Sequence, residues 1–80
     1  MNKKENQLPQ FGLCLKNEGY PASLEVGKLY RVIPDDDAVA HGYIRVIDES
    51  GEDYAYTASR FHLMQVPIAV EKALLSASQA

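Results

Sequence analysis

Apolar and polar residues alternate along several short stretches of the chain, the pattern of β-strands that bury one face. In 43–48 (YIRVID), Ile44 and Val46 fall on one side of the predicted strand and Tyr43 and Arg45 on the other. The same alternation groups Phe11 with Leu13 and Leu15, and Tyr30 with Val32. The pattern predicts five strands, at 11–16, 28–34, 43–48, 53–57 and 61–66.

The segments between these strands carry turn residues. The long connection 17–27 holds Gly19, Pro21 and Gly27 and is predicted to be an irregular loop. DDDAVAHG (35–42) fits either one helical turn, with aspartate at its start and Gly42 at its end, or a polar loop. TASRF (57–61) is predicted to be a short break or a tight helical turn.

Four carboxylates surround one glycine in RVIDESGEDYAY (45–56). A type I turn on Asp48-Glu49-Ser50-Gly51 explains two of these residues. Asp48 accepts a hydrogen bond from the amide two residues on, and Gly51 takes a left-handed conformation. Glu49, Glu52 and Asp53 then need only be solvated charges, so the cluster is expected to be a hairpin and not a reactive centre.

The C-terminal segment has helix-forming residues after Pro67, which suits a first helical position. A helix is predicted here, with one apolar stripe of Val70, Ala73, Leu74 and Ala77. A helix this short must pack on something. Its apolar residues, which also include Ile68 and Leu75, are expected to dock on the chain's own strands or on a second copy.

Length and composition indicate one domain, since 80 residues with 46% apolar content supply a single core. We expect a flexible N-terminus at 1–9, a β-domain at 10–66 and a docked helix at 67–78. No apolar run approaches the ~20 residues that cross a bilayer. With a single cysteine and no signal-like N-terminus, a cytoplasmic protein without membrane association is expected.

Charge is unevenly distributed. Residues 35–53 hold seven acidic side chains against Arg45 alone, a net charge of −6, although the whole chain carries −3. Such a region repels phosphate backbones, which makes nucleic-acid binding the least favoured function. It would require five basic residues to gather on one face: Lys16, Lys28, Arg31, Arg45 and Arg60.

Metal-binding and catalytic patterns are missing from the sequence. The acidic segments lack the spacing of a calcium loop, and Cys14, His41 and His62 do not have the spacing of zinc ligands. Cys14 lies in a predicted strand, where an unpaired cysteine acts as a small apolar residue. We therefore expect no metal, no cofactor and no catalytic residue, hence a protein that is not an enzyme.

Tyrosines are the most promising residues for recognition, because they offer a large contact area with a polar tip. The candidate partner-binding residues are Tyr20, Tyr43, Tyr54, Tyr56, Glu52 and Asp53. Aromatic rings beside carboxylates suit a cationic protein or peptide partner. The leading expectation is thus a non-catalytic binding or adaptor module. The alternative is a regulatory or structural accessory protein that acts as a homodimer; a monomer or a weak homodimer is expected.

The order of these segments resembles the Src-homology-three-like family of small barrels. KLYRVIP, YIRVIDESG, EDYAYTASRF and LMQV look like successive strands of that fold, and TASRF stands at its small-residue break, with Thr57 in place of the usual proline. The chain is also similar to a group of short bacterial proteins predicted to form such barrels. The resemblance covers residues 10–66 and implies a mainly β, five-stranded antiparallel barrel with a short C-terminal α-helix.

The resemblance does not extend to the family's peptide-binding residues. Members that bind polyproline use a tryptophan at the start of one strand, and this chain has no tryptophan. Tyr43 stands at that position. The acidic first strand of those members is also replaced by FGLCLK. Polyproline recognition is therefore not expected.

Overall fold

The structure is a computed structural model that describes residues 10–79, with side chains described as far as Ser76. The expected flexible N-terminus, 1–9, lies outside the described residues. The elements along the chain are β1 (Gln10–Cys14), β2 (Leu29–Ile33), α1 (Asp36–Ala40), β3 (Tyr43–Ile47), β4 (Asp53–Thr57), the 3-10 turn η2 (Ala58–Arg60), β5 (Phe61–Gln65) and α2 (Ile68–Gln79).

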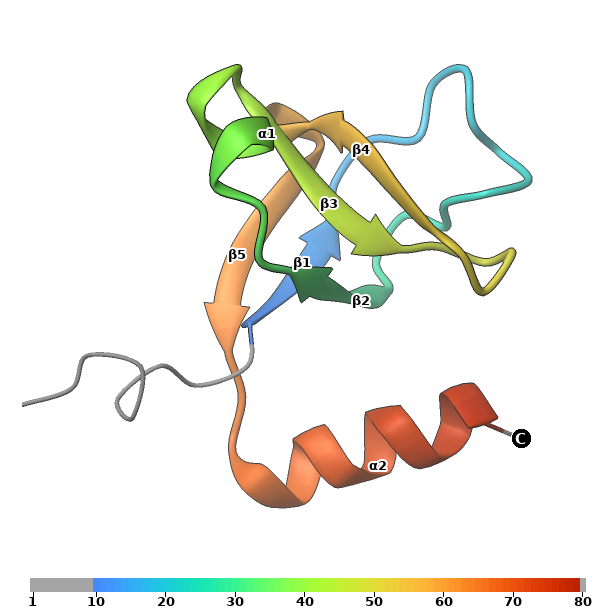
Figure 1. The fold of residues 1–80 in the computed structure, drawn as a ribbon. Helices are drawn as coiled ribbons and strands as arrows, with labels where there is room; N and C mark the ends of the chain where they lie inside the picture. The colour runs from blue at the N-terminus through green and yellow to red at the C-terminus, as the bar shows by residue number, and fades with distance from the viewer. Residues whose placement is uncertain (1–9, 80) are drawn as a thin grey trace, which may run out of the picture.

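The five strands form one antiparallel sheet in the order β4-β3-β2-β1-β5 (Figure 1). β2 belongs to both parts of the sheet. Its first half pairs with β1 at Leu29–Arg31, and its second half pairs with β3 at Val32 and Ile33. The predicted mainly β, five-stranded antiparallel architecture with a C-terminal helix is confirmed. β4 and β5 are the two edges, so strand pairing among the described residues leaves the sheet open.

One face of the sheet, called the inner face here, forms the core. Every strand contributes to it, and Leu24 from the long loop completes it; the buried members are Cys14, Leu24, Tyr30, Ile44, Val46, Tyr56 and Phe61. The predicted pairing of Ile44 with Val46 on a buried face is confirmed. Cys14 is buried like an apolar residue, as expected. Edge-to-face contacts join the Phe61 ring to Tyr30 and Tyr56.

Gly12 allows the core to close over β1. A Cβ atom at this position would lie 3.1–3.3 Å from Cδ1, Cβ and Cγ of Phe61 on β5. Those distances are shorter than an ordinary contact, and Phe61 is buried on the inner face. A side chain at this point of β1 would therefore require the Phe61 ring to shift.

The helical turn predicted as one possibility for 35–42 is present. The Asp35 side chain caps α1 by accepting from the Ala38 amide at 3.0 Å. Gly42 has φ +81° and donates its amide to the Val39 carbonyl. Local sequence chemistry thus sets both ends of this turn.

The sequence predicts one buried face for β1, but its opposite, outer face is covered as well as its inner face. Phe11 and Cys14 are the most buried side chains of β1, at 2% and 1% exposure, although they lie on opposite faces. Leu15, grouped with Phe11 in the prediction, follows the strand and is 49% exposed. Helix α2 lies over the outer face, and its Leu74 and Leu75 line a cleft together with Phe11.

The predicted apolar stripe of α2 is only partly correct. Leu74 and Leu75 are half-buried, whereas Ile68 and Val70 are 66% and 40% exposed and Ala73 is exposed. The side chain of Ala77 lies outside the described side chains. Within residues 10–79 no helix is long and apolar enough to cross a bilayer.

Candidate functional site

The hairpin between β3 and β4 has the predicted turn. The Gly51 amide donates to the Asp48 carbonyl at 2.9 Å, and the Ser50 amide donates to Asp48 Oδ1 at 2.9 Å. Gly51 has φ +85°. The turn chemistry expected from the sequence is therefore confirmed, and it accounts for two residues of the acidic stretch.

Asp48 is more than a turn residue, because only 5% of it is exposed. The Tyr56 hydroxyl donates to its Oδ2 at 2.7 Å, and the Ser50 hydroxyl donates to Oδ1. Burial by itself raises the pKa of the Asp48 carboxyl, but the bonds from Ser50 and Tyr56 outweigh it and hold that pKa below its usual value. Burial, and then the bond to Asp48, raise the pKa of Tyr56 to about 12.

Glu49 forms the second polar centre of the hairpin. Its carboxylate pairs with Lys28 Nζ at 2.7 Å and accepts from the Tyr30 hydroxyl. The Lys28 bond, followed by the Tyr30 bond, lowers the pKa of Glu49. Burial and the bond to Glu49 raise the pKa of Tyr30. The prediction that Glu49 is only a solvated charge is wrong, because its partners come from β2 and the residue before it, which the hairpin sequence does not reveal.

These contacts attach the long loop, residues 15–28, to the hairpin. The Glu49 amide donates to the Ser23 carbonyl at 2.9 Å, and the Tyr30 hydroxyl accepts from the Glu25 amide at 2.7 Å. No buried side-chain nitrogen or oxygen in the described part of the chain lacks a hydrogen-bond partner. The loop and the hairpin therefore form one bonded unit, called the loop–hairpin unit below.

Tyr20 projects from this unit. Its ring meets Tyr56 edge-on at a centroid distance of 5.0 Å, and the Arg60 guanidinium lies 4.8 Å from the Tyr20 ring centre. Even so, 45% of Tyr20 is exposed. A buried tyrosine on one side and an arginine on another thus hold an accessible ring in one orientation.

Tyr54 and Glu52 lie on the same side of the molecule as Tyr20. Tyr54 and Tyr56 both lie on the inner face of β4, where they pair with Val46 and Ile44 of β3, respectively. Tyr54 is 49% exposed, and its hydroxyl donates to Glu52 Oε1 at 3.1 Å. The bond to Glu52 raises the pKa of Tyr54. The structure therefore provides two accessible rings near buried Tyr56: Tyr20, which contacts it, and Tyr54, two residues away on the same face of β4.

The other two candidate residues lie on the outer face. Tyr43 is 41% exposed and pairs with Thr57, and Asp53 pairs with Ile47. Asp53 Oδ2 is 3.4 Å from Arg45. The six candidate residues are thus divided between two faces: Tyr20, Glu52, Tyr54 and buried Tyr56 on one, Tyr43 and Asp53 on the other.

Arg45 links the acidic segments on the outer face. Its Nε lies 2.9 Å from Asp35 Oδ2, and its Nη1 reaches Asp53. The bond to the Ala38 amide and then the bond to Arg45 lower the pKa of Asp35. Two of the seven acids in 35–53 therefore share the single arginine of that segment as their ion-pair partner.

Of the five basic residues named in the nucleic-acid alternative, three already contact other side chains of the described chain. Lys28 is paired with Glu49, Arg45 with two aspartates, and Arg60 lies on Tyr20. Arg31 projects from the outer face of β2. This distribution offers no support for the nucleic-acid alternative.

Metal-ligating residues are also dispersed. Among the described residues no group of three or more histidine, cysteine, aspartate or glutamate side chains is placed to hold a metal ion. Cys14 is buried in the core, and the exposed His41 contacts the Asp37 carbonyl through Nδ1 at 2.8 Å.

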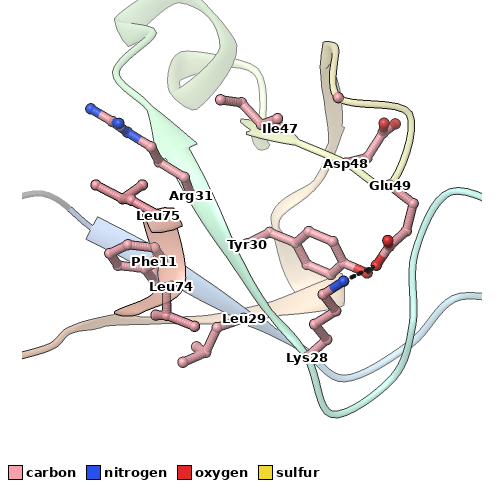
Figure 2. A pocket seen from close by; sticks show the side chains of 11 residues that line it. Phe11, Lys28, Leu29, Tyr30, Arg31, Ile47, Asp48, Glu49, Leu74 and Leu75 are labelled. Atoms are coloured by element: carbon pink, nitrogen blue, oxygen red, sulfur yellow. Dashed lines mark hydrogen bonds and ion pairs between the residues drawn. The ribbon is translucent and has the colours of Figure 1, made fainter. Parts of the chain in front are cut away.

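A cleft of about 520 Å3 lies between α2 and the outer face of the sheet (Figure 2). Its apolar end is lined by Phe11, Leu29, Leu74 and Leu75. At its other end Lys28 reaches Glu49, so the polar groups there already bond to each other. The cleft therefore separates the loop–hairpin unit from the helix.

Sequence reasoning missed two features of this site. Arg60 was considered only as a possible phosphate ligand, yet it orients Tyr20. The contact between Tyr20 and Tyr56 joins residues 36 positions apart, and no local signal in the sequence reveals it.

Comparison of the chain with known protein families, curated proteins and solved structures found no match.

Proposed function

We propose that this protein is a non-catalytic binding module that recognises a cationic protein segment through Tyr20, Tyr54 and Glu52. The observation that carries the proposal is the pair of accessible rings, Tyr20 at 45% and Tyr54 at 49% exposure, held beside the buried ring of Tyr56. Rigid aromatic rings supply binding area at a low cost in conformational entropy.

The fold supports this proposal. We propose that the curved sheet is a Src-homology-three-like barrel, since β2 is shared by two parts of the sheet and η2 precedes the last strand. The barrel supplies a fixed platform, and the exposed side chains supply the specificity.

The chemistry of the surface favours a partner that carries arginine or lysine. The Tyr54 ring and the Glu52 carboxylate are adjacent, and an arginine can stack on the ring while it pairs with the acid. Tyr20 already has Arg60 on it, so the partner's cation is expected at the Tyr54 end.

Selection of random peptides displayed on phage tests the proposal. We expect enriched peptides to contain arginine or lysine and, in 15N NMR titrations, to shift amides near Tyr20, Glu52 and Tyr54. The double substitution Tyr20→Ala/Tyr54→Ala should weaken binding by at least about tenfold, as loss of two interface aromatics does.

Tyr43→Ala is the matched control, because Tyr43 is 41% exposed but lies on the outer face. We expect it to leave the affinity unchanged. Peptides that bind the double variant as tightly as the parent protein, or a selection that enriches nothing, would refute the proposed surface.

A further inference from the structure

Within residues 10–79, no strand pairs with the outer edge of β5, and this strand has exposed side chains on both faces. Only Phe61 of this strand is buried. Leu63, on the inner side, is 41% exposed, and Met64, on the outer side, is 37% exposed. β5 pairs with β1 alone among the described strands and lies at the margin of the sheet (Figure 1).

The ladder shows which backbone groups of β1 point toward β5. The Cys14 amide donates to the Lys28 carbonyl, on the β2 side, whereas the Leu15 amide donates to the Arg60 carbonyl at 2.7 Å, on the β5 side. Backbone groups alternate in direction along an antiparallel strand. Leu13 therefore directs its amide and carbonyl toward β5, as Leu15 does.

The same alternation assigns the backbone groups of β5. His62 is paired with Leu13, so the amide and carbonyl of His62 face β1, and those of Met64 do the same two residues later. The amides and carbonyls of Leu63 and Gln65 consequently point to the open side. Each of these residues offers one donor and one acceptor for another strand.

The sequence of β5 does nothing to protect this edge. Residues 61–65 contain no lysine, arginine, aspartate, glutamate or proline, and their register with β1 runs without a bulge. Natural proteins usually block exposed edges with such charges, prolines or bulges. An uncharged edge with exposed Leu63 and Met64 is suited to pairing with another strand.

We propose that β5 pairs antiparallel with β5 of a second copy, so that a two-fold axis joins the two five-stranded sheets. Leu63 and Gln65 each carry an outward-facing backbone amide and carbonyl. The two-fold axis therefore lets amides on one strand meet carbonyls on the other. No charged side chain of residues 61–65 is brought against its own kind.

Charge distribution favours a second copy as the occupant. The acidic segment 35–53 carries −6, whereas residues 54–80 carry +1. β5 and the acidic hairpin lie on opposite sides of the molecule in Figure 1. Pairing through β5 therefore keeps the acidic hairpins (48–53) of the two copies apart. The start of α2 follows β5 directly, and its Ile68 and Val70 are exposed.

Sedimentation equilibrium from micromolar to millimolar concentration tests this pairing. We expect the average mass to rise from the 8.9 kDa monomer toward the dimer and no further. Leu63→Lys should weaken association by at least about tenfold, because the two-fold axis brings two added positive charges onto the same short pair of edges. Val26→Lys, at a 53% exposed residue of the loop, should leave association unchanged.

Amide exchange of the unsubstituted protein gives a readout that does not depend on a variant. The Leu63 and Gln65 amides should exchange more slowly as concentration rises, whereas His62 and Met64, already bonded to β1, should not change. A concentration-independent monomer, association that Leu63→Lys does not affect, or assemblies larger than a dimer would overturn the pairing.

Discussion

The loop–hairpin unit and the helix α2 both bring distant segments onto the sheet, but by different interactions. The loop–hairpin unit is held by directional bonds to two carboxylates, Asp48 and Glu49, one of them buried. Helix α2 rests on the outer face through Leu74 and Leu75, beside Phe11, and leaves a cleft of about 520 Å3.

The difference shows how geometry is specified in a small domain. Hydrogen bonds fix distance and direction, and a buried group without its partner costs free energy. Apolar contacts have no preferred direction. The unit fixed by directional bonds is thus the one that carries Tyr20 and Tyr54, whereas Leu74 and Leu75 meet the outer face through apolar side chains.

The largest expected effect comes from removal of the Asp48 carboxylate. Asp48→Ala deletes the acceptor of the turn and leaves the buried Tyr56 hydroxyl without that partner. We expect the free energy of unfolding to fall by about 2–3 kcal/mol, the cost of an unsatisfied buried group. Urea denaturation followed by circular dichroism measures this change.

Asp53→Ala is the control for that experiment. The Asp53 side chain is 54% exposed and pairs weakly with Arg45 at 3.4 Å, so little change in stability is expected. If both substitutions cost the same free energy, the buried bonds of Asp48 are not what holds the loop–hairpin unit together.

A smaller effect is expected at the helix. Leu74→Ala together with Leu75→Ala removes half-buried apolar groups and should lower the free energy of unfolding by about 1–2 kcal/mol, below the cost of burying two full leucines. Hydrogen exchange should become faster in α2 and stay unchanged in β3 and β4. Faster exchange throughout the sheet would show that α2 is integral to the core and would end the comparison.

The smallest expected effect is a dependence on pH. The carboxyl pKa values of Asp48 and Glu49 lie below the ordinary values of 3.8 and 4.5. A carboxyl group whose pKa is lowered by folding contributes its full stabilisation at pH values above its ordinary pKa. That stabilisation is lost as the pH falls through the lowered pKa of the folded state. Unfolding measured from pH 7 to about pH 3 should show the loss below about pH 4.5.

Asp48→Asn separates this contribution from that of the other carboxylates, including Asp35, whose pKa is also lowered. An amide does not titrate, so the variant should lose less stability than the parent protein across the same pH range. An identical pH dependence in the two proteins would assign the loss to other carboxylates.

Much of the fold could be predicted from the sequence because its signals are local. Alternation located all five strands to within one or two residues, and Asp48 with Gly51 defined the hairpin turn. The capping residues Asp35 and Gly42 likewise indicated α1. Each of these signals depends only on residues within one element.

The errors concern contacts between elements. Phe11 is buried because α2, some sixty residues later, covers the outer face, and alternation within β1 cannot reveal this cover. Glu49 is bonded because β2 supplies Tyr30. For the candidate site, the sequence identified the tyrosines, but the buried position of Tyr56 and the role of Arg60 depend on how the loop 15–28 folds back.

The single cysteine of the chain can report transient opening of the domain. Cys14 is 1% exposed in the core, its Sγ contacts the Lys16 carbonyl, and burial raises the pKa of its thiol. An alkylating reagent can reach the sulfur only when β1 separates from the residues that enclose it. The labelling rate therefore counts opening events at the centre of the sheet, with no engineered probe.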